Sequence, residues 1–189
     1  MSIELEAPGL EAPCLRIRDT RADELAALQE IDIAANEIFR DTGLLDLSPG
    51  SVHSEPIPEN LLRVGLGEAL LWCAVEDRDI PVGFALASRK ENALYLDQVS
   101  VTPAHSGKGY GTYLVRRVLK EAKRRKVQRV SLSTFRHIPW NGPFYRKLGF
   151  QEIPVWRLTD WQCALIEIQS KSMDVSKRCF MEKTVRRFY

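Results

Sequence analysis

The sequence predicts one α/β domain built on a mixed, mostly antiparallel sheet of about seven strands. Apolar-rich stretches at residues 71–75, 82–87 and 94–101 follow one another with only turn-like segments between them, which is the order of an antiparallel meander. A long helical pattern separates the third stretch from a strand at residues 130–134, and a helical crossover favours parallel pairing. The chain has 189 residues and no repeat or long linker, so its length is that of a single domain.

A short strand and two helices are expected before the meander. Residues 14–18 alternate between apolar and polar side chains and predict the first strand. The apolar spacing after Asp19 predicts a helix that ends at Gly43. Residues 44–55 are rich in Ser, Pro and Gly and predict a loop, and a second helix is expected after Pro58.

Helix and strand patterns alternate after residue 134. Residues 139–148 predict a short helix, and residues 150–156 predict a strand. Thr159 and Gln162 have the spacing of a capping box at the start of a further helix. Residues 178–185 predict the last strand.

Bulk properties exclude several classes of protein. The formal net charge is +2, which favours no particular partner, and no apolar run approaches the ~20 residues of a membrane-spanning helix. Residues 1–13 are acidic and contain proline, so we expect a flexible segment there rather than a signal peptide, and a domain at residues 14–189. The four cysteines lie far apart without a C-x-x-C pair, so we expect reduced thiols, no metal site and a cytoplasmic protein.

The glycine-rich turn Ser106-Gly107-Lys108-Gly109-Tyr110-Gly111 joins the third meander strand to the long helix. A strand, a glycine turn and a helix present free backbone N–H groups to an anion. The spacing is not that of a P-loop, which requires G-x-x-x-x-G-K-[ST], and the meander before it argues against a dinucleotide-binding unit. A tight turn before a core helix, without a ligand, is the alternative.

Two blocks of sequence resemble motifs of the Gcn5-related N-acetyltransferase (GNAT) family. Gly107 and Gly109 match the glycines of motif A, although Ser106 stands where the family usually has Gln or Arg. The stretch NGPFYRKLGF, at residues 141–150, resembles motif B through its Phe-Tyr pair and its Gly-Phe ending. The resemblance extends from about residue 16 to residue 185, which is nearly the whole chain.

The resemblance implies helices on both faces of the sheet, a splay between the fourth and fifth strands, and acetyl-CoA as the cofactor. The backbone of Val99 and Val101 would bond the pantetheine arm. The N–H groups of the loop and the helix start would bind the pyrophosphate. These cofactor-binding residues are Gly107, Lys108, Gly109, Tyr110, Gly111 and Thr112.

The implied reaction is attack of a primary amine on the thioester, and it benefits from an acid and a base. The resemblance implies Tyr145 as the general acid, with packing against the cofactor as the alternative. Strand alternation places Tyr95, Asp97 and Val99 on one face unless a bulge exchanges the faces. Asp97 is the first candidate for the base and His137 the second, because histidine titrates near neutrality.

The acceptor is expected to be an amine of a small molecule or a peptide. Glu37 and Asp41 lie four residues apart on one helical face and could bind a cationic amine, or could simply be solvated. Trp140 could line the acceptor cavity, or could pack the short helix against the sheet. The basic face at residues 116–129 lacks interleaved aromatic residues, so nucleic acid is an unlikely partner. A homodimer paired through the C-terminal segment is a further possibility, and a catalytically idle acyl-CoA-binding or regulatory domain is the alternative function.

Overall fold

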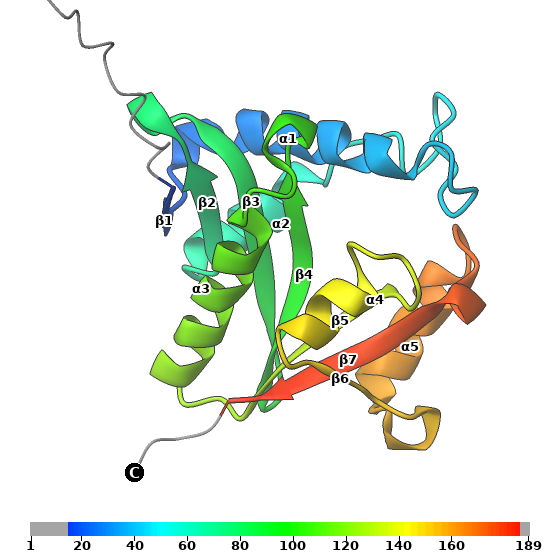
Figure 1. The fold of residues 1–189 in the computed structure, drawn as a ribbon. Coiled ribbons are helices and arrows are strands. Elements are labelled where there is room, and N and C mark those ends of the chain that lie inside the picture. Colours follow the sequence, from blue (N-terminus) through cyan, green and yellow to red (C-terminus); the bar gives the residue numbers. More distant parts are fainter. Residues whose placement is uncertain (1–14, 186–189) are drawn as a thin grey trace, which may run out of the picture.

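A computed structural model describes residues 15–185, so the segment at residues 1–13 that was expected to be flexible lies outside the described residues. Seven strands form one sheet in the order β1-β2-β3-β4-β5-β7-β6 (Figure 1). Every neighbouring pair is antiparallel except β4 and β5, which are parallel as predicted. The strands are β1 (Arg16–Asp19), β2 (Leu71–Val75), β3 (Pro81–Lys90), β4 (Ala93–Val101), β5 (Arg129–Phe135), β6 (Gln151–Glu152) and β7 (Arg178–Thr184).

Helices cover both faces of this sheet, as expected. The apolar side chains of the strands alternate between the two faces, so that Trp72 and Leu96 pack with α3 while Phe84 and Leu86 pack with α1 and α2. Helices α3 and α4 lie on one face, and α1, α2 and α5 lie on the other. The helices are α1 (Leu25–Asn36), α2 (Glu59–Gly67), α3 (Tyr110–Arg124), α4 (Gly142–Lys147) and α5 (Asp160–Gln169). None of the helices within residues 15–185 has the length and apolar character needed to cross a membrane.

The predicted strand at residues 150–156 is shorter than expected. Only Gln151–Glu152 form β6 beside β7, and a 3-10 turn at Val155–Arg157 follows. Pro154 precedes this turn and has no N–H group with which to continue a ladder. The chain therefore leaves the sheet two residues after entering it, and Trp156 is 86% exposed.

The first helix also ends before the predicted position. α1 ends at Asn36, and the 3-10 turn Glu37–Phe39 replaces the last helical turn expected before Gly43. The capping box at Thr159 and Gln162 is confirmed, because the Thr159 N–H donates to Gln162 Oε1 at 2.9 Å. The last strand, β7, pairs with β5 on one side and β6 on the other, within the same chain.

One buried carboxylate organises the basic face of α3. Glu121 is only 2% exposed and accepts hydrogen bonds from three guanidinium groups. The nearest atoms of Arg124, Arg125 and Arg117 lie 2.5, 2.7 and 3.1 Å from its oxygens. These donors, Arg124 first, lower the pKa of Glu121 to about 2 despite its burial. Arg117 also lies over the Trp72 ring, at 4.8 Å from its centroid, so these three arginines have structural partners.

Replacing Glu121 by Gln should lower the free energy of unfolding at pH 7 by about 1–3 kcal/mol, because three charge-assisted hydrogen bonds lose their charge. A depressed pKa stabilises the fold above about pH 4.5, and this contribution is lost as the pH falls toward about 2. Urea unfolding from pH 7 to pH 3 should thus show a weaker pH dependence in Glu121→Gln than in the wild type. Glu59→Gln, which affects an exposed pair with Arg63, serves as the control; equal effects of the two substitutions would contradict this role of Glu121.

Candidate active site

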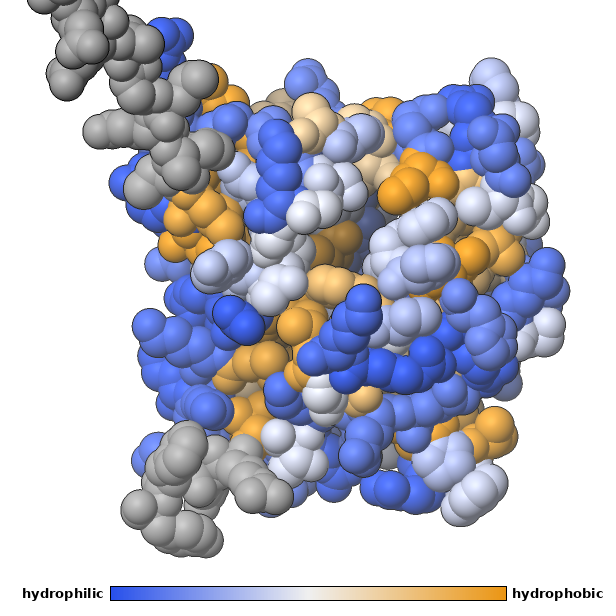
Figure 2. Space-filling model, viewed as in Figure 1, coloured by the Kyte–Doolittle hydropathy of each residue, from blue (hydrophilic) through white to orange (hydrophobic). Residues whose placement is uncertain are grey.

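The site lies where the parallel pair β4 and β5 separates. The two strands are paired only from Ala93 and Arg129 to Tyr95 and Ser131, and beyond these residues β4 has no neighbour on that edge. Two cavities of about 430 and 440 Å³ open along the gap. In Figure 2 the surface is hollowed between α1 at the top of the view and α4 below it. We refer to the smaller cavity, beside the start of α3, as the cofactor cleft and to the larger one as the acceptor cavity.

A β-bulge at Asp97 changes which side chains share a face. Leu86 is paired with Gln98 and Ala87 with Leu96, so Asp97 is the extra residue on β4. The predicted alternation is therefore wrong from Val99 on, where the faces are exchanged by the bulge that was considered as the alternative. Tyr95 packs on the α5 side, whereas Val99 packs with the core beneath α3.

The cofactor cleft is built around the start of α3. Gly107 and Gly109 have φ angles of 77° and 91°, a left-handed conformation that glycine adopts without steric cost. The first helical hydrogen bond runs from Tyr113 N to Gly109 O, so the N–H groups of Tyr110, Gly111 and Thr112 precede the helical ladder. These groups and the positive end of the helix dipole fit a pyrophosphate.

Most of the residues predicted to bind the cofactor line this cleft. Val99 and Val101 form its strand side, and the loop and helix residues Gly107, Gly109, Tyr110, Gly111 and Thr112 form its other side. Lys108 is exposed and does not line the cleft. The sequence analysis missed His105, which lines the cleft and is held between Thr102 Oγ1 at 2.7 Å and Glu76 Oε2 at 2.8 Å.

Tyr145 lies at the junction of the two cavities. It belongs to α4 and lines both the cofactor cleft and the acceptor cavity. Its ring makes edge contacts with Phe144 and Phe150, at centroid distances of 5.0 and 5.7 Å. Burial raises the pKa of the Tyr145 hydroxyl, which therefore stays protonated at neutral pH.

Asp97 lies on the wall of the acceptor cavity. Its carboxylate accepts a hydrogen bond from Ser88 Oγ at 3.2 Å. The side chain reaches solvent through the cavity, yet the surrounding protein removes enough hydration to raise the pKa of Asp97 to about 6. A carboxylate with this pKa is ionised at pH 7 and is more basic than an ordinary aspartate.

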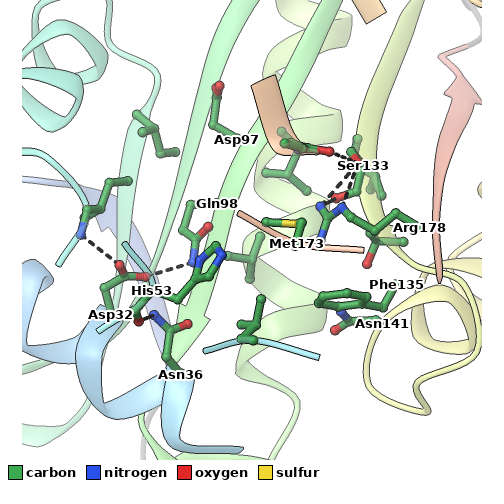
Figure 3. A pocket seen from close by; sticks show the side chains of 18 of the residues that line it. Asp32, Asn36, His53, Asp97, Gln98, Ser133, Phe135, Asn141, Met173 and Arg178 are labelled. Atoms are coloured by element: carbon green, nitrogen blue, oxygen red, sulfur yellow. Dashed lines mark hydrogen bonds between the residues drawn. The ribbon is translucent and has the colours of Figure 1, made fainter. Parts of the chain in front are cut away.

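The acceptor cavity contains a buried carboxylate that the sequence analysis missed. Asp32, on α1, is 4% exposed and accepts hydrogen bonds from Ser100 Oγ and Gln98 Nε2, each at 2.8 Å, and from Ile57 N at 2.9 Å. Burial raises the pKa of Asp32 and these donors oppose the rise. Because the three partners belong to β4 and to the segment before α2, Asp32 fixes α1 and that segment against the strand (Figure 3).

Several residues expected near the acceptor lie elsewhere. Glu37 is exposed and pairs with Arg40, and neither Glu37 nor Asp41 lines a described cavity. His137, the second candidate for the base, is exposed and lines neither cavity. Trp140 lines the cofactor cleft and contacts the Phe39 ring edge-on at 6.0 Å.

Known proteins share this fold. The model of the acetyltransferase (GNAT) family matches residues 34–150 of the chain. The chain belongs to the GNAT family. The peptidyl-lysine N-acetyltransferase YjaB of Escherichia coli K12 is 34% identical over 93 residues, which are 49% of this chain and 57% of YjaB. The matched region therefore spans little more than half the length of that relative.

Solved GNAT structures superpose on nearly the whole chain. PaiA N-acetyltransferase from Thermoplasma acidophilum, solved in complex with coenzyme A, has a TM-score of 0.71 at 19% identity, covering 90% of this chain and 98% of that one. The ribosomal-protein-S18-alanine N-acetyltransferase of Escherichia coli has a TM-score of 0.64 at 17% identity, covering 93% and 96%. The splay between β4 and β5 is thus part of a shared fold, and acetyl-CoA is the cosubstrate that family membership supports.

Replacing Gly109 by Asp should weaken acetyl-CoA binding at least ~100-fold, because the new side chain places a negative charge beside the pyrophosphate and strains a residue at φ 91°. Isothermal titration with acetyl-CoA measures the loss. Gly50→Asp is the matched control: Gly50 has a φ of 85° and lines neither cavity, so this variant should bind like the wild type. Unchanged binding in Gly109→Asp would contradict a phosphate site at this turn.

Proposed function

We propose that this GNAT protein transfers an acetyl group from acetyl-CoA to a primary amine of a small molecule or a peptide. The observation that carries the proposal is that the two cavities meet inside the protein. They share six lining residues, which are Asn36, Phe39, Gln98, Val99, Asn141 and Tyr145. A thioester reaching the junction from the cofactor cleft would meet an amine from the acceptor cavity, and holding two reactants together in this way removes much of the entropic barrier.

Asp97 is the proposed general base. An alkyl amine with a pKa near ~10.4 is neutral in only roughly one part in a thousand at pH 7, so the amine must lose a proton before it attacks. Asp97 combines a position on the acceptor-cavity wall with a pKa raised to about 6, the two properties that such a base requires. It accepts the proton directly or through a water molecule.

Tyr145 is the proposed general acid. Acetyl-CoA, when bound, supplies an acetyl thioester, whose sulfur must leave as a thiol. Tyr145 lines both cavities and its hydroxyl remains protonated, so it can donate a proton to the departing sulfur. The rings of Phe144 and Phe150 contact the Tyr145 ring edge-on and hold it in place.

The proposal is tested by thiol release from acetyl-CoA with a panel of polyamines, amino acids, aminoglycosides and lysine peptides. Lysine peptides belong in the panel because YjaB is named as a peptidyl-lysine N-acetyltransferase. Amine-dependent thiol release, with a matching N-acetyl product, is the expected result. Acetyl-CoA binding without turnover of any amine would favour the second candidate, an idle acyl-CoA-binding domain.

Tyr145→Phe should lower kcat at least ~10-fold while leaving the affinity for acetyl-CoA within about twofold, because only the proton donor is removed. Steady-state kinetics together with acetyl-CoA titration measure the two effects. Tyr113→Phe removes the hydroxyl of an exposed tyrosine on α3 that lines neither cavity, and it should leave kcat unchanged. Wild-type kcat in Tyr145→Phe would remove the assignment of Tyr145 as the acid.

The turnover rate should rise with pH through about 6 and then level, because a general base works in its ionised form. Asp97→Asn should remove this limb of the pH profile and lower kcat at least ~10-fold. His137→Gln should retain the limb, since His137 lies outside both cavities. A profile that persists in Asp97→Asn and disappears in His137→Gln would exchange the two candidates.

A further inference from the structure

In the part of the chain that the structure describes, the acceptor cavity contains one Lys or Arg side chain, and it has no acidic partner. Arg178, at the start of β7, is the only Lys or Arg that lines this cavity within residues 15–185. Its hydrogen bonds go to Ser133, from Nη2 to the carbonyl oxygen at 3.0 Å and from Nη2 and Nε to Oγ at 3.2 and 3.3 Å. Arg178 forms no ion pair with any Asp or Glu of the described chain, and burial lowers the pKa of its guanidinium. Arg178 is partly buried, and a cation withdrawn from water and paired only with neutral groups is costly unless a ligand supplies the missing negative charge.

The guanidinium is held in a fixed orientation. It lies over the Phe135 ring at 4.8 Å from the centroid, and Ser133 binds its Nε and Nη2 edge. The Ser133 hydroxyl donates its own proton to Gln169 Oε1 at 3.1 Å, so it must accept from Arg178. Nη1 hydrogen-bonds to no residue within 15–185, and Figure 3 shows the guanidinium directed into the cavity.

The opposite side of the same cavity is acidic. Asp32 lies across the cavity from Arg178 in Figure 3, and Asp97 and Glu55 also line the cavity. The cavity therefore offers negative charge near β4 and α1, and positive charge near β7. A small molecule with a cationic amine at one end and an anionic group at the other matches this distribution.

We infer that the acceptor is an amine that also carries a carboxylate, as a free amino acid does, and that Arg178 binds this carboxylate. The inference rests on the proposed function, because it names the substrate class of the same site. A guanidinium presents planar N–H groups that match a carboxylate, and an ion-paired hydrogen bond is about twice as strong as a neutral one. Arg178 is a specificity residue in this scheme, and Tyr145 and Asp97 perform the chemistry.

The decisive experiment measures binding without turnover. The protein is saturated with coenzyme A, which cannot donate an acetyl group, and is titrated calorimetrically with the twenty common L-amino acids and with their carboxamides. At least one amino acid should bind ~10-fold or more tightly than its carboxamide. Amides that bind as well as the acids, or no binding by any acid, would overturn the inference.

Variants of Arg178 show whether this side chain binds the carboxylate of the amino acid. Arg178→Met should reduce the acid-to-amide ratio to about one, and Arg178→Lys should give an intermediate ratio because it keeps the charge and loses the planar fork. Arg129→Met is the matched control: Arg129 lies on neighbouring β5, is exposed, pairs with Glu182 and lines neither cavity, so the ratio should persist. A ratio that persists in Arg178→Met would also overturn the inference.

Steady-state kinetics distinguish carboxylate binding by Arg178 from an indirect effect on the general acid, Tyr145. With acetyl-CoA, Arg178→Met should raise KM for the amino acid ~10-fold or more and leave kcat/KM for the corresponding decarboxylated amine nearly unchanged. An equal loss of kcat for both acceptors would mean that Arg178 acts through Tyr145 instead. If no acceptor is acetylated while the acid-to-amide ratio in binding holds, the proposed function fails and the carboxylate site remains.

Discussion

The ladder between β4 and β5 ends after three residue pairs, and the site depends on this early end. A strand edge inside a protein has backbone N–H and C=O groups that must find partners. In this chain the free edge of β4 borders a cleft of about 430 Å³ that continues to the start of α3. The bulge at Asp97 lies just beyond the last paired residue, on the wall of the second cavity. Two neighbouring departures from regular pairing thus accompany the cofactor cleft, the acceptor cavity and the candidate base.

Two charged side chains shape the acceptor cavity, the buried Asp32 and the partly buried Arg178, and each is held by neutral groups. Asp32 accepts from a serine, a glutamine side chain and a backbone amide, while within residues 15–185 Arg178 donates only to Ser133. Burying a charge in this way costs stability, since neutral partners replace only part of the lost hydration. The hydrogen bonds fix the position of both groups before a ligand arrives, which reduces the ordering required on binding. The cavity thus holds two charged groups in fixed positions, at a cost in stability.

Features with a local signal were predictable. The glycine turn at residues 106–111, the capping box at Thr159 and the meander of β2, β3 and β4 each appear in the structure, because adjacent residues determine them. The strand at residues 150–156 was overestimated because its apolar pattern outweighed Pro154. The regular face pattern expected for β4 was wrong from Val99 on, because the extra residue at the bulge exchanges the faces of the side chains that follow it.

The sequence by itself determined the fold class, the family and the loop that precedes α3, since short motifs with fixed spacing encode them. The tertiary structure alone decided which side chains face the acceptor. Asp32 lies 66 residues from Gln98 along the chain, and Arg178 lies 45 residues from Ser133. No periodicity links residues so far apart, because sheet order and register bring them together. Those long-range contacts place the guanidinium of Arg178, which has no acidic partner within residues 15–185, across the cavity from the carboxylate of Asp32.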